Sequence, residues 1–480
     1  MAPLHVPVLR AGRPYRSLQV AELHDVRDGA LVAEVSQAIP GVIARDLGRA
    51  AENQAKLEER TVADLLLVCR RAGELFGEAE LPLGEATQTP EQYLEQLAAT
   101  SGMPIAMGRR NMEKITGVLA GMEHVLGGLT RGLDYTVLDG GYGTWGNRQI
   151  SYQRQSDNLG AVLPNNSPGV HNLWLPAIPF KVPLVLRPGS AEPWTPYRLA
   201  AAFFEAGLPR EAFSLYPSDY GGATEILLRT GRSMFFGDAS TVRGWQGQGK
   251  VQVHGPGWSK VILGPDAAED WRRHLDLVAS SVAANGGRSC INASGVWTPS
   301  QAREIAEALA EKLASIVARP LDDPAAELAA FPDPEIARRI SDLVDSQLAA
   351  GGAEDLTAKY REGSRVAEAG GCTFLLPTVV RCDGPDHPLA SCEFLFPFAS
   401  VVTTPQEGLP GRIGPTLVAT AITRDEDFRQ ALLACRNIDR LNLGPIPTGR
   451  VSWDQPHEGN LFEHLYRQRA VQAAAAPAGA

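Results

Sequence analysis

Apolar residues recur at helical spacing through the first quarter of the chain. The ranges 46–77 and 89–128 both show this period, for example at Val62, Leu65 and Cys69. Such spacing is typical of amphipathic helices that bury one face. We therefore expect a largely helical N-terminal part.

Residues 133–158 show an alternating pattern instead. Polar and apolar positions alternate at Tyr135–Leu138 and again at Gln149–Arg154, with a glycine-rich turn between them. This pattern predicts a protruding β-hairpin. The turn, Gly141–Gly146, matches the dinucleotide motif G-x-G-x-x-G, but a polar strand follows where a phosphate-binding helix would begin. We interpret these glycines as a hairpin turn.

From Ala161 onward, short apolar runs alternate with helical stretches. Strands that alternate with helices favour parallel βαβ units. A first set ends near residue 263, and a second set follows Cys290. In the second set we expect helices at 299–318 and 334–348 and strands near 373–380 and 399–403. The pattern predicts an α/β protein with two such domains.

Composition narrows the functional class. A chain of 480 residues is too long for one ordinary core, and a net charge of −10 argues against a surface that tracks nucleic-acid phosphates. No apolar run approaches membrane-spanning length, and Met1–Arg10 lack the pattern of a secretory signal. We expect a cytoplasmic protein with a small-molecule partner, no nucleic acid and no membrane.

The cysteines point to thiol chemistry rather than to metal or disulfides. The chain has six cysteines, none in a Cys-x-x-Cys pair and none with a histidine pattern that completes a ligand set. No metal site is predicted. Cys290 lies in the segment Asn285–Asn292, rich in glycine and polar residues, and is the candidate nucleophile; the alternative is a small buried apolar residue.

Six short motifs occur in a characteristic order along residues 130–450. They are Leu163–Pro168, Leu186–Ser190, Glu205–Pro209, Phe236–Thr241, the cysteine segment and Glu393–Pro397. Together they resemble the aldehyde dehydrogenase superfamily. The resemblance implies two Rossmann-like α/β domains of the aldehyde dehydrogenase type plus a β-hairpin oligomerisation flap.

The resemblance also implies domain boundaries. The coenzyme-binding domain would hold residues 1–132 and 159–253, the oligomerisation hairpin 133–158 and the catalytic thiol domain 254–445. A C-terminal segment, 446–480, would end in a low-complexity tail. This segment departs from the family, which usually has a Pro-Phe-Gly-Gly motif and a final bridging strand, so we expect a homodimer rather than the usual tetramer.

The catalytic residues follow from the same resemblance. Cys290 stands at the family's nucleophile and Asn166 at its oxyanion-hole amide. His254 replaces the glutamate that activates water for deacylation, in the stretch Val253–Lys260. A histidine titrates near neutrality, with an unperturbed pKa of roughly 6.5, so it could serve as the general base. The alternative is a core or helix-capping histidine.

Cofactor contacts are implied at three places. Gly237, Asp238 and Ser240 match the turn that faces the cofactor phosphates, and Glu393 matches the carboxylate that grips the nicotinamide ribose. Arg187 and Ser190 replace the usual lysine and glutamate near the adenosine ribose. A carboxylate there repels a 2′-phosphate, so its absence leaves both NAD and NADP open.

The resemblance therefore implies an NAD(P)-dependent oxidoreductase that converts an aldehyde to a carboxylic acid through a thioester on Cys290. Two alternatives stay open. Because His254 replaces the glutamate, the thioester could instead pass to coenzyme A, as in acyl-CoA reductases of this superfamily. The chain could also be a catalytically silent scaffold.

Overall fold

A run of helices occupies most of the stretch from residue 40 to residue 129, as the apolar spacing predicts for 46–77 and 89–128; the helix at Pro40–Leu47 was not predicted. The structure, a computed structural model, describes residues 3–472, so the predicted low-complexity tail lies outside the described residues. Thr61 and Thr89 begin their helices with capping boxes, which satisfy free N–H groups of the first turn. The helices are α1 (Pro40–Leu47), α2 (Ala50–Glu58), α3 (Val62–Glu78), α4 (Pro90–Ser101), α5 (Ile105–Ala120) and α6 (Met122–Leu129).

The first large sheet has the strand order β14-β13-β10-β11-β12-β2-β3. Neighbours from β14 to β12 run parallel, whereas β2 and β3 are added antiparallel. Crossover helices α8 (Trp194–Glu205) and α9 (Tyr220–Arg229) follow β11 and β12. The strands are β2 (Val8–Arg10), β3 (Arg13–Tyr15), β10 (Leu159–Val162), β11 (Leu184–Arg187), β12 (Phe213–Leu215), β13 (Arg232–Phe236) and β14 (Val251–His254).

The second large sheet has the order β17-β20-β21-β16-β15-β22-β23, and all neighbours except β17 and β20 run parallel. The helices and strands predicted after Cys290 are present. The strands are β15 (Ser259–Leu263), β16 (Ala293–Thr298), β17 (Ala353–Asp355), β20 (Thr378–Cys382), β21 (Phe398–Thr403), β22 (Thr416–Ile422) and β23 (Ile438–Leu443). The main helices are α12 (Leu275–Ala283), α13 (Ala302–Leu313), α14 (Pro334–Ala349) and α16 (Glu426–Leu433).

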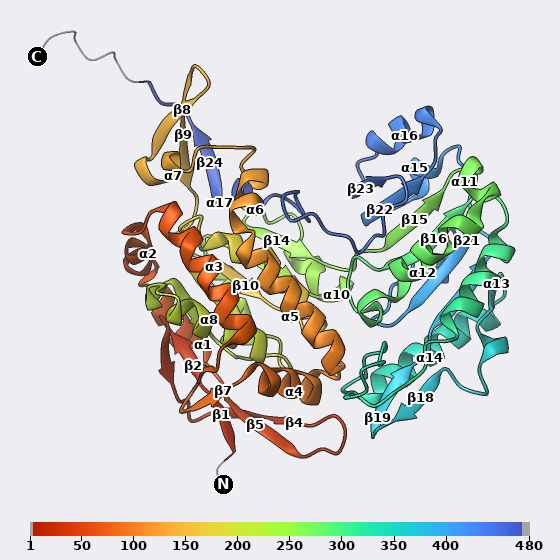
Figure 1. The fold of residues 1–480 in the computed structure, drawn as a ribbon, viewed down its shortest axis with the longest axis horizontal. Coiled ribbons are helices and arrows are strands. Elements are labelled where there is room, and N and C mark those ends of the chain that lie inside the picture. Colours follow the sequence, from red (N-terminus) through yellow and green to blue (C-terminus); the bar gives the residue numbers. More distant parts are fainter. Residues whose placement is uncertain (1–2, 473–480) are drawn as a thin grey trace, which may run out of the picture.

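A small antiparallel sheet projects from the first half of the molecule (Figure 1). β8 (Tyr142–Trp145) and β9 (Arg148–Arg154) form a hairpin in the predicted region, and Gly141–Gly146 is not a phosphate loop. The prediction that Gly141–Gly146 is the hairpin turn is wrong, because most of this stretch is strand β8, and the turn follows Trp145, which pairs with Arg148. The prediction of a strand at Tyr135–Leu138 is wrong, because α7 (Thr136–Gly140) begins there. The Asp134 carboxylate accepts from the Thr136 backbone N–H at 2.9 Å, which favours a helical turn over an extended strand.

The last strand of the described residues is also one that the sequence did not lead us to expect. β24 (Tyr466–Arg469) pairs antiparallel with β9, after the short helix α17 (Leu461–Leu465). A final bridging strand is thus present although the usual motif before it is absent. Five short strands before residue 37 were likewise not predicted, among them β1 (Leu4–Val6), β4 (Val20–His24) and β5 (Leu31–Ser36), which form their own sheet.

Each large sheet has its own core, and the two halves lie side by side (Figure 1). The chain passes from the first sheet to the second between His254 and Ser259. It returns after β23, so that Leu461, Phe462 and Leu465 pack into the first core. This return draws the C-terminal segment across the junction. The mixed α/β fold with two largely parallel sheets confirms the predicted fold class. Among residues 3–472, none of the helices is both long enough and apolar enough to cross a membrane.

Candidate active site

The carboxyl ends of four parallel strands carry most of the predicted first-half site residues. Asn166 follows β10, Arg187 ends β11, Gly237 follows β13 and His254 ends β14. The strand order reverses between β10 and β13, because β11 and β12 continue to one side and β14 to the other. Ligands of open α/β sheets bind at the carboxyl end of such a switch point. The topology therefore gathers these residues at a ligand-binding edge.

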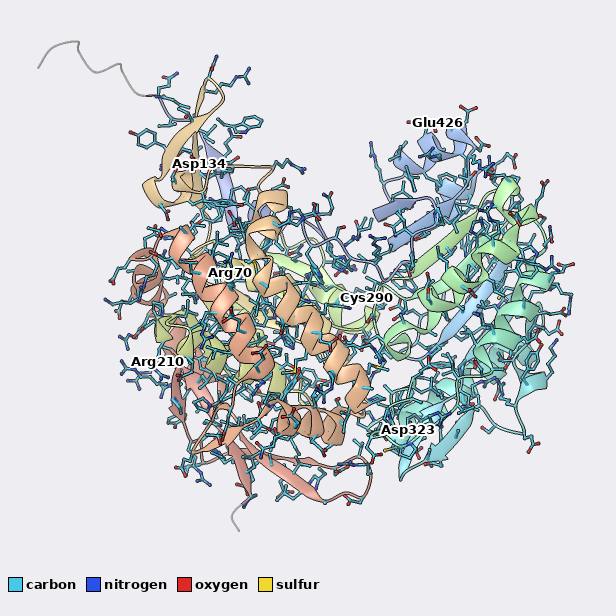
Figure 2. The ribbon with its side chains drawn as sticks, in the orientation of Figure 1. Arg70, Asp134, Arg210, Cys290, Asp323 and Glu426 are labelled. Carbon is cyan, nitrogen blue, oxygen red and sulfur yellow. The ribbon has the colours of Figure 1, made fainter. Side chains whose placement is uncertain are left out.

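Cys290 lies at the junction of the two halves, in the loop between α12 and β16 (Figure 2). The loop turns through three left-handed residues, Asn285, Gly286 and Gly287, whose φ angles are 54°, 65° and 69°. Glycine adopts this region without strain and asparagine tolerates it, which explains the Asn-Gly-Gly sequence. A β-strand, β16, separates the loop from the helix predicted after Cys290.

Hydrogen bonds hold this loop in place from several directions. The Asn285 side chain donates to Ser167 Oγ at 3.1 Å, beside the predicted oxyanion residue. Ser259 Oγ donates to the Cys290 carbonyl at 2.9 Å. The buried guanidinium of Arg288 donates to the Ser101 carbonyl at 3.0 Å. The thiol is thus positioned by contacts from both halves of the molecule.

Asn166 lies against the cysteine loop, as the sequence predicts. Its Nδ2 donates to the backbone carbonyl of Arg288 at 2.8 Å, and its Oδ1 is buried without a hydrogen-bond partner among the described residues. An amide nitrogen carries two N–H donors, so one remains after the bond to Arg288.

Glu393 comes from the second half and is fixed by backbone donors. Its carboxylate accepts from the N–H of Gly257 at 3.2 Å and from the N–H of Trp258 at 2.5 Å. Burial raises the pKa of Glu393 to about 7 despite these bonds. Burial also lowers the pKa of the nearby Lys260 to about 8; its ammonium donates to the Trp258 carbonyl at 2.7 Å.

His254 is buried, and its ring stacks on Phe236 with centroids 4.3 Å apart. Its Nδ1 is hydrogen-bonded to a carboxylate oxygen of Glu458, and its Nε2 is buried without a partner among the described residues. Of the two alternatives to a catalytic role, a helix cap is wrong, because His254 ends strand β14, whereas a core histidine agrees with its burial. The catalytic role of His254 stays a prediction.

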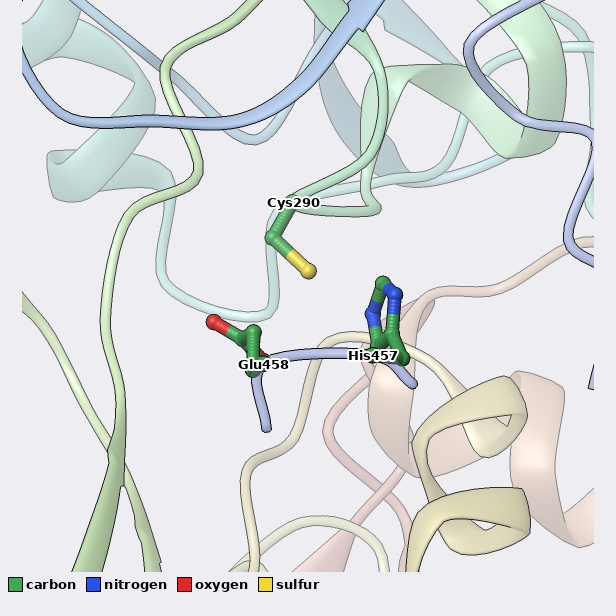
Figure 3. Close-up of side chains that lie close together, drawn as sticks. All are labelled: Cys290, His457 and Glu458. Atoms are coloured by element: carbon green, nitrogen blue, oxygen red, sulfur yellow. The ribbon is translucent and has the colours of Figure 1, made fainter. Parts of the chain in front are cut away.

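Glu458 and His457 are the residues that sequence reasoning missed. The Sγ of Cys290, a ring nitrogen of His457 and a carboxylate oxygen of Glu458 all lie within 4.8 Å of one another (Figure 3). Glu458 has a left-handed backbone, with φ of 52°, and its carbonyl accepts from the Gln252 side chain. Non-glycine residues in this region often mark functional sites. One sequence signal could have pointed to Glu458 and His457: residues 453–460 depart from the family pattern.

Burial and neighbouring charges shift the pKa values of the three groups in this cluster in different directions. Burial, together with the carboxylates of Glu458 and Glu393, raises the pKa of the Cys290 thiol well above its usual value. Burial acts to raise the pKa of Glu458, but the nearby His254 and His457 together lower that pKa below the usual value. Burial lowers the pKa of His457 to about 4. At neutral pH the cluster therefore holds a thiol, a carboxylate and a neutral imidazole.

The predicted adenosine end contains no carboxylate at position 190. Arg187 donates through Nε and Nη2 to the Ser218 carbonyl at 3.1 and 3.0 Å, and the exposed Ser190 accepts from Asn165 at 3.3 Å. Arg187 is thus tied to the protein backbone instead of being a free surface charge.

The predicted phosphate-facing turn differs from expectation in one respect. The Asp238 carboxylate accepts from the backbone N–H groups of Ser240 and Thr241 at 2.8 and 2.9 Å. These are donors that an unprotected helix start would offer to an anion. Asp238 therefore places a negative charge beside the position predicted for the phosphates.

Comparisons with known proteins agree with this arrangement. The sequence profile of the Aldehyde dehydrogenase family matches residues 81–408. No curated protein sequence matches the chain significantly. Among solved structures, the aldehyde dehydrogenase KauB from Pseudomonas aeruginosa is 15% identical, with a TM-score of 0.78 over 98% of this chain and 97% of that one.

Two further structures show the same likeness. A putative aldehyde dehydrogenase from Burkholderia cenocepacia is 17% identical, with a TM-score of 0.76 over 97% of this chain and 96% of that one. A putative methylmalonate-semialdehyde dehydrogenase from Sinorhizobium meliloti, complexed with NAD, is 19% identical, with a TM-score of 0.75 over 100% of this chain and 99% of that one. At such identities the likeness shows the fold, and the profile match over more than half of the residues shows the family. The chain belongs to the aldehyde dehydrogenase family, whose enzymes oxidise aldehydes with NAD or NADP.

Proposed function

We propose that this protein oxidises an aldehyde to a carboxylic acid through a covalent thiohemiacetal and thioester on Cys290. The observation that carries the proposal is that the thiol lies near a carboxylate, which is itself hydrogen-bonded to a buried histidine. Glu458 lies within 4.8 Å of Cys290 Sγ and is hydrogen-bonded to His254. These are the groups that thiol attack and later hydrolysis both require.

The first step is activation of the thiol. Because the pKa of Cys290 is raised, the sulfur needs a base, and the ionised Glu458 carboxylate, within 4.8 Å of the sulfur, is near enough to take its proton through one water. The Sγ–C bond then forms and the carbonyl oxygen becomes an oxyanion. The remaining N–H of Asn166 and the Cys290 backbone N–H are the proposed donors to this oxygen.

The cofactor edge fits a dinucleotide, because the strand ends that carry Arg187 and Gly237 flank the switch point. Ser190, Asp238 and Ser240 would line the same edge, and Glu393 would hold the ribose near the thiol. NAD or NADP bound there would accept the hydride from the thiohemiacetal, which would thereby become the thioester. The absence of a carboxylate at Ser190 makes NADP acceptable, whereas Asp238 opposes tight phosphate contact.

Hydrolysis of the thioester needs a base for water. The imidazole of His254, hydrogen-bonded to Glu458, can take a proton from water while the carboxylate stabilises the resulting imidazolium. Water adds to the thioester carbon, the C–S bond breaks, and the acid leaves with the thiol restored. We further propose a homodimer built on the β8–β9–β24 sheet and a cytoplasmic location.

Transfer to coenzyme A is the second candidate. The observation that favours it is the position of His254, whose Nδ1 is bound to Glu458 and whose ring is held against Phe236, so the base has little freedom to reach a water. The thioester would then persist until another thiol took the acyl group. A silent scaffold would form no thioester.

Mass spectrometry of the intact protein separates these candidates. The enzyme is mixed with a panel of aldehydes and NAD or NADP, with and without coenzyme A, alongside His254→Asn and the control His24→Asn, which changes an exposed histidine in β4. We expect wild type and the control to turn over without coenzyme A, and His254→Asn to accumulate an acyl adduct of one per chain. A wild-type adduct that clears only with coenzyme A would establish the second candidate, and no adduct or turnover with any aldehyde would refute both.

A further inference from the structure

The group of Cys290, His457 and Glu458 has the composition of a metal site. The thiol sulfur, an imidazole nitrogen and a carboxylate oxygen lie within 4.8 Å of one another, and their side chains converge in Figure 3. They come from two segments, the loop before β16 and the segment between β23 and α17. Sulfur, nitrogen and oxygen in this combination are the ligands that Zn²⁺ prefers.

The three ligand atoms are separated by distances close to those between the ligands of a bound cation. Zinc bonds of about 2.3 Å to sulfur and about 2.0 Å to nitrogen or oxygen place tetrahedral ligand atoms about 3.3–3.8 Å apart. Small side-chain rotations would bring these three groups to that separation. Glu458 is already oriented, because His254 binds its carboxylate and Gln252 binds its backbone carbonyl. Such outer contacts are characteristic of metal ligands.

Charge also favours a divalent cation. When a cation binds, a Cys290 thiolate and the Glu458 carboxylate would together supply two negative charges, and His457 would supply a neutral imidazole nitrogen. The positive charge of Arg440 opposes a bound cation, because its Nη1 lies 3.3 Å from Nδ1 of His457. Either the Arg440 side chain turns away when the metal binds, or the metal binds the other ring nitrogen of His457, Nε2.

We propose that Cys290, His457 and Glu458 bind a thiolate-preferring divalent cation such as Zn²⁺, which closes the C-terminal segment onto the thiol. On binding, the Sγ–H proton is released to solvent and an Sγ–metal bond forms, with no electron transferred. A chelator reverses the step. The inhibition that follows, because a metal-bound sulfur cannot attack an aldehyde, rests on the proposed function; the site itself does not.

Cobalt titration of the full chain tests the site without any reaction. Co²⁺ held by a thiolate gives a near-ultraviolet charge-transfer band, and a tetrahedral site gives intense visible bands. We expect saturation at one Co²⁺ per chain, displacement by Zn²⁺ and no charge-transfer band in Cys290→Ser. His457→Gln should weaken binding by at least about tenfold, the scale on which disturbed metal sites lose affinity.

Two further variants sharpen the result. Arg440→Met removes the competing charge and should tighten binding, whereas His24→Gln, on an exposed strand, should leave it unchanged. Melting temperatures check that each variant is folded. A missing thiolate band in folded wild type, or equal affinity in His457→Gln and His24→Gln, would overturn the proposal. A band in a protein without dehydrogenase activity would refute the proposed function and leave the metal site standing; activity without a band would do the reverse.

Discussion

The backbone of Gly257 packs directly against that of the proposed nucleophile Cys290, and Gly257→Ala should disable the nucleophile. A Cβ at this position would lie 2.0 Å from the Cys290 carbonyl oxygen and 2.8 Å from its carbonyl carbon, whereas 3.4–4 Å is ordinary contact. The two segments must therefore separate by more than about 1 Å, because both atoms that clash belong to backbone and cannot rotate away.

Separating these two segments would displace groups that position the site. The Gly257 carbonyl accepts from the Leu417 N–H at 2.7 Å, and the Gly257 N–H donates to Glu393. Both hydrogen bonds resist movement of Gly257 away from Cys290. The displacement is thus expected in the Cys290 loop. Overpacking typically costs about 1–3 kcal/mol of stability. A misplacement of about 1 Å at a reacting group can cost about a hundredfold in rate, or roughly 2.7 kcal/mol.

Gly255→Ala is the matched control, two residues away in the same loop. Its Cβ would meet only the Val242 side chain at 3.5 Å, an ordinary contact. We would measure kcat with an aldehyde and NAD(P), the rate at which iodoacetamide alkylates Cys290, and Tm. We expect Gly257→Ala to lose about a hundredfold in kcat with altered alkylation, and Gly255→Ala to stay near wild type. Equal kcat and alkylation rates in the two folded variants would refute this reasoning.

Three further predictions concern Asn166, Glu393 and Asp238. Asn166→Ala removes one proposed oxyanion donor and should lower kcat by about 10²–10³-fold with little change in KM; a loss confined to KM would exclude that role. The pKa of Glu393 is raised to about 7, so its contribution to stability falls as pH rises from 4.5 through 7. Glu393→Gln should therefore be more stable than wild type by up to about 3 kcal/mol at pH 8 and equal to it below pH 4.5, as measured by urea unfolding; the opposite pH trend would contradict the assignment. Asp238→Asn keeps the helix cap but removes a charge beside the proposed phosphates, so cofactor Kd in a fluorescence titration should fall by about 2–5-fold, and an unchanged Kd would place the phosphates elsewhere.

Local sequence was sufficient where the governing interactions are local. Amphipathic spacing predicted the helices within residues 46–77 and 89–128, because a helix buries one face at a period of 3.6 residues whatever it packs against. The residues after Gly141–Gly146 excluded a dinucleotide loop, because they alternate like a strand where a phosphate-binding helix would begin. The Asn-Gly-Gly turn before Cys290 also reflects a local need, since the backbone there is left-handed.

Short segments were harder, because their structure depends on a partner. Tyr135–Leu138 alternates like a strand, yet the Asp134 side chain bonds the first turn of α7. β2 is a strand because it pairs with β12, and β24 because it pairs with β9. A strand of three or four residues has no hydrogen bonds of its own, so the neighbour that completes it decides whether it forms.

The sequence by itself determined which residue types the site contains: a cysteine in a turn, an asparagine after a strand and a histidine where a glutamate is usual. Only the tertiary structure decided their relations. The strand order brings Asn166 and Gly237 to one switch point, and the return of the chain after β23 brings Glu458 and His457 to Cys290. Contacts between segments so distant along the chain are fixed by how the two sheets pack and how the last strand pairs, and local periodicity does not record them.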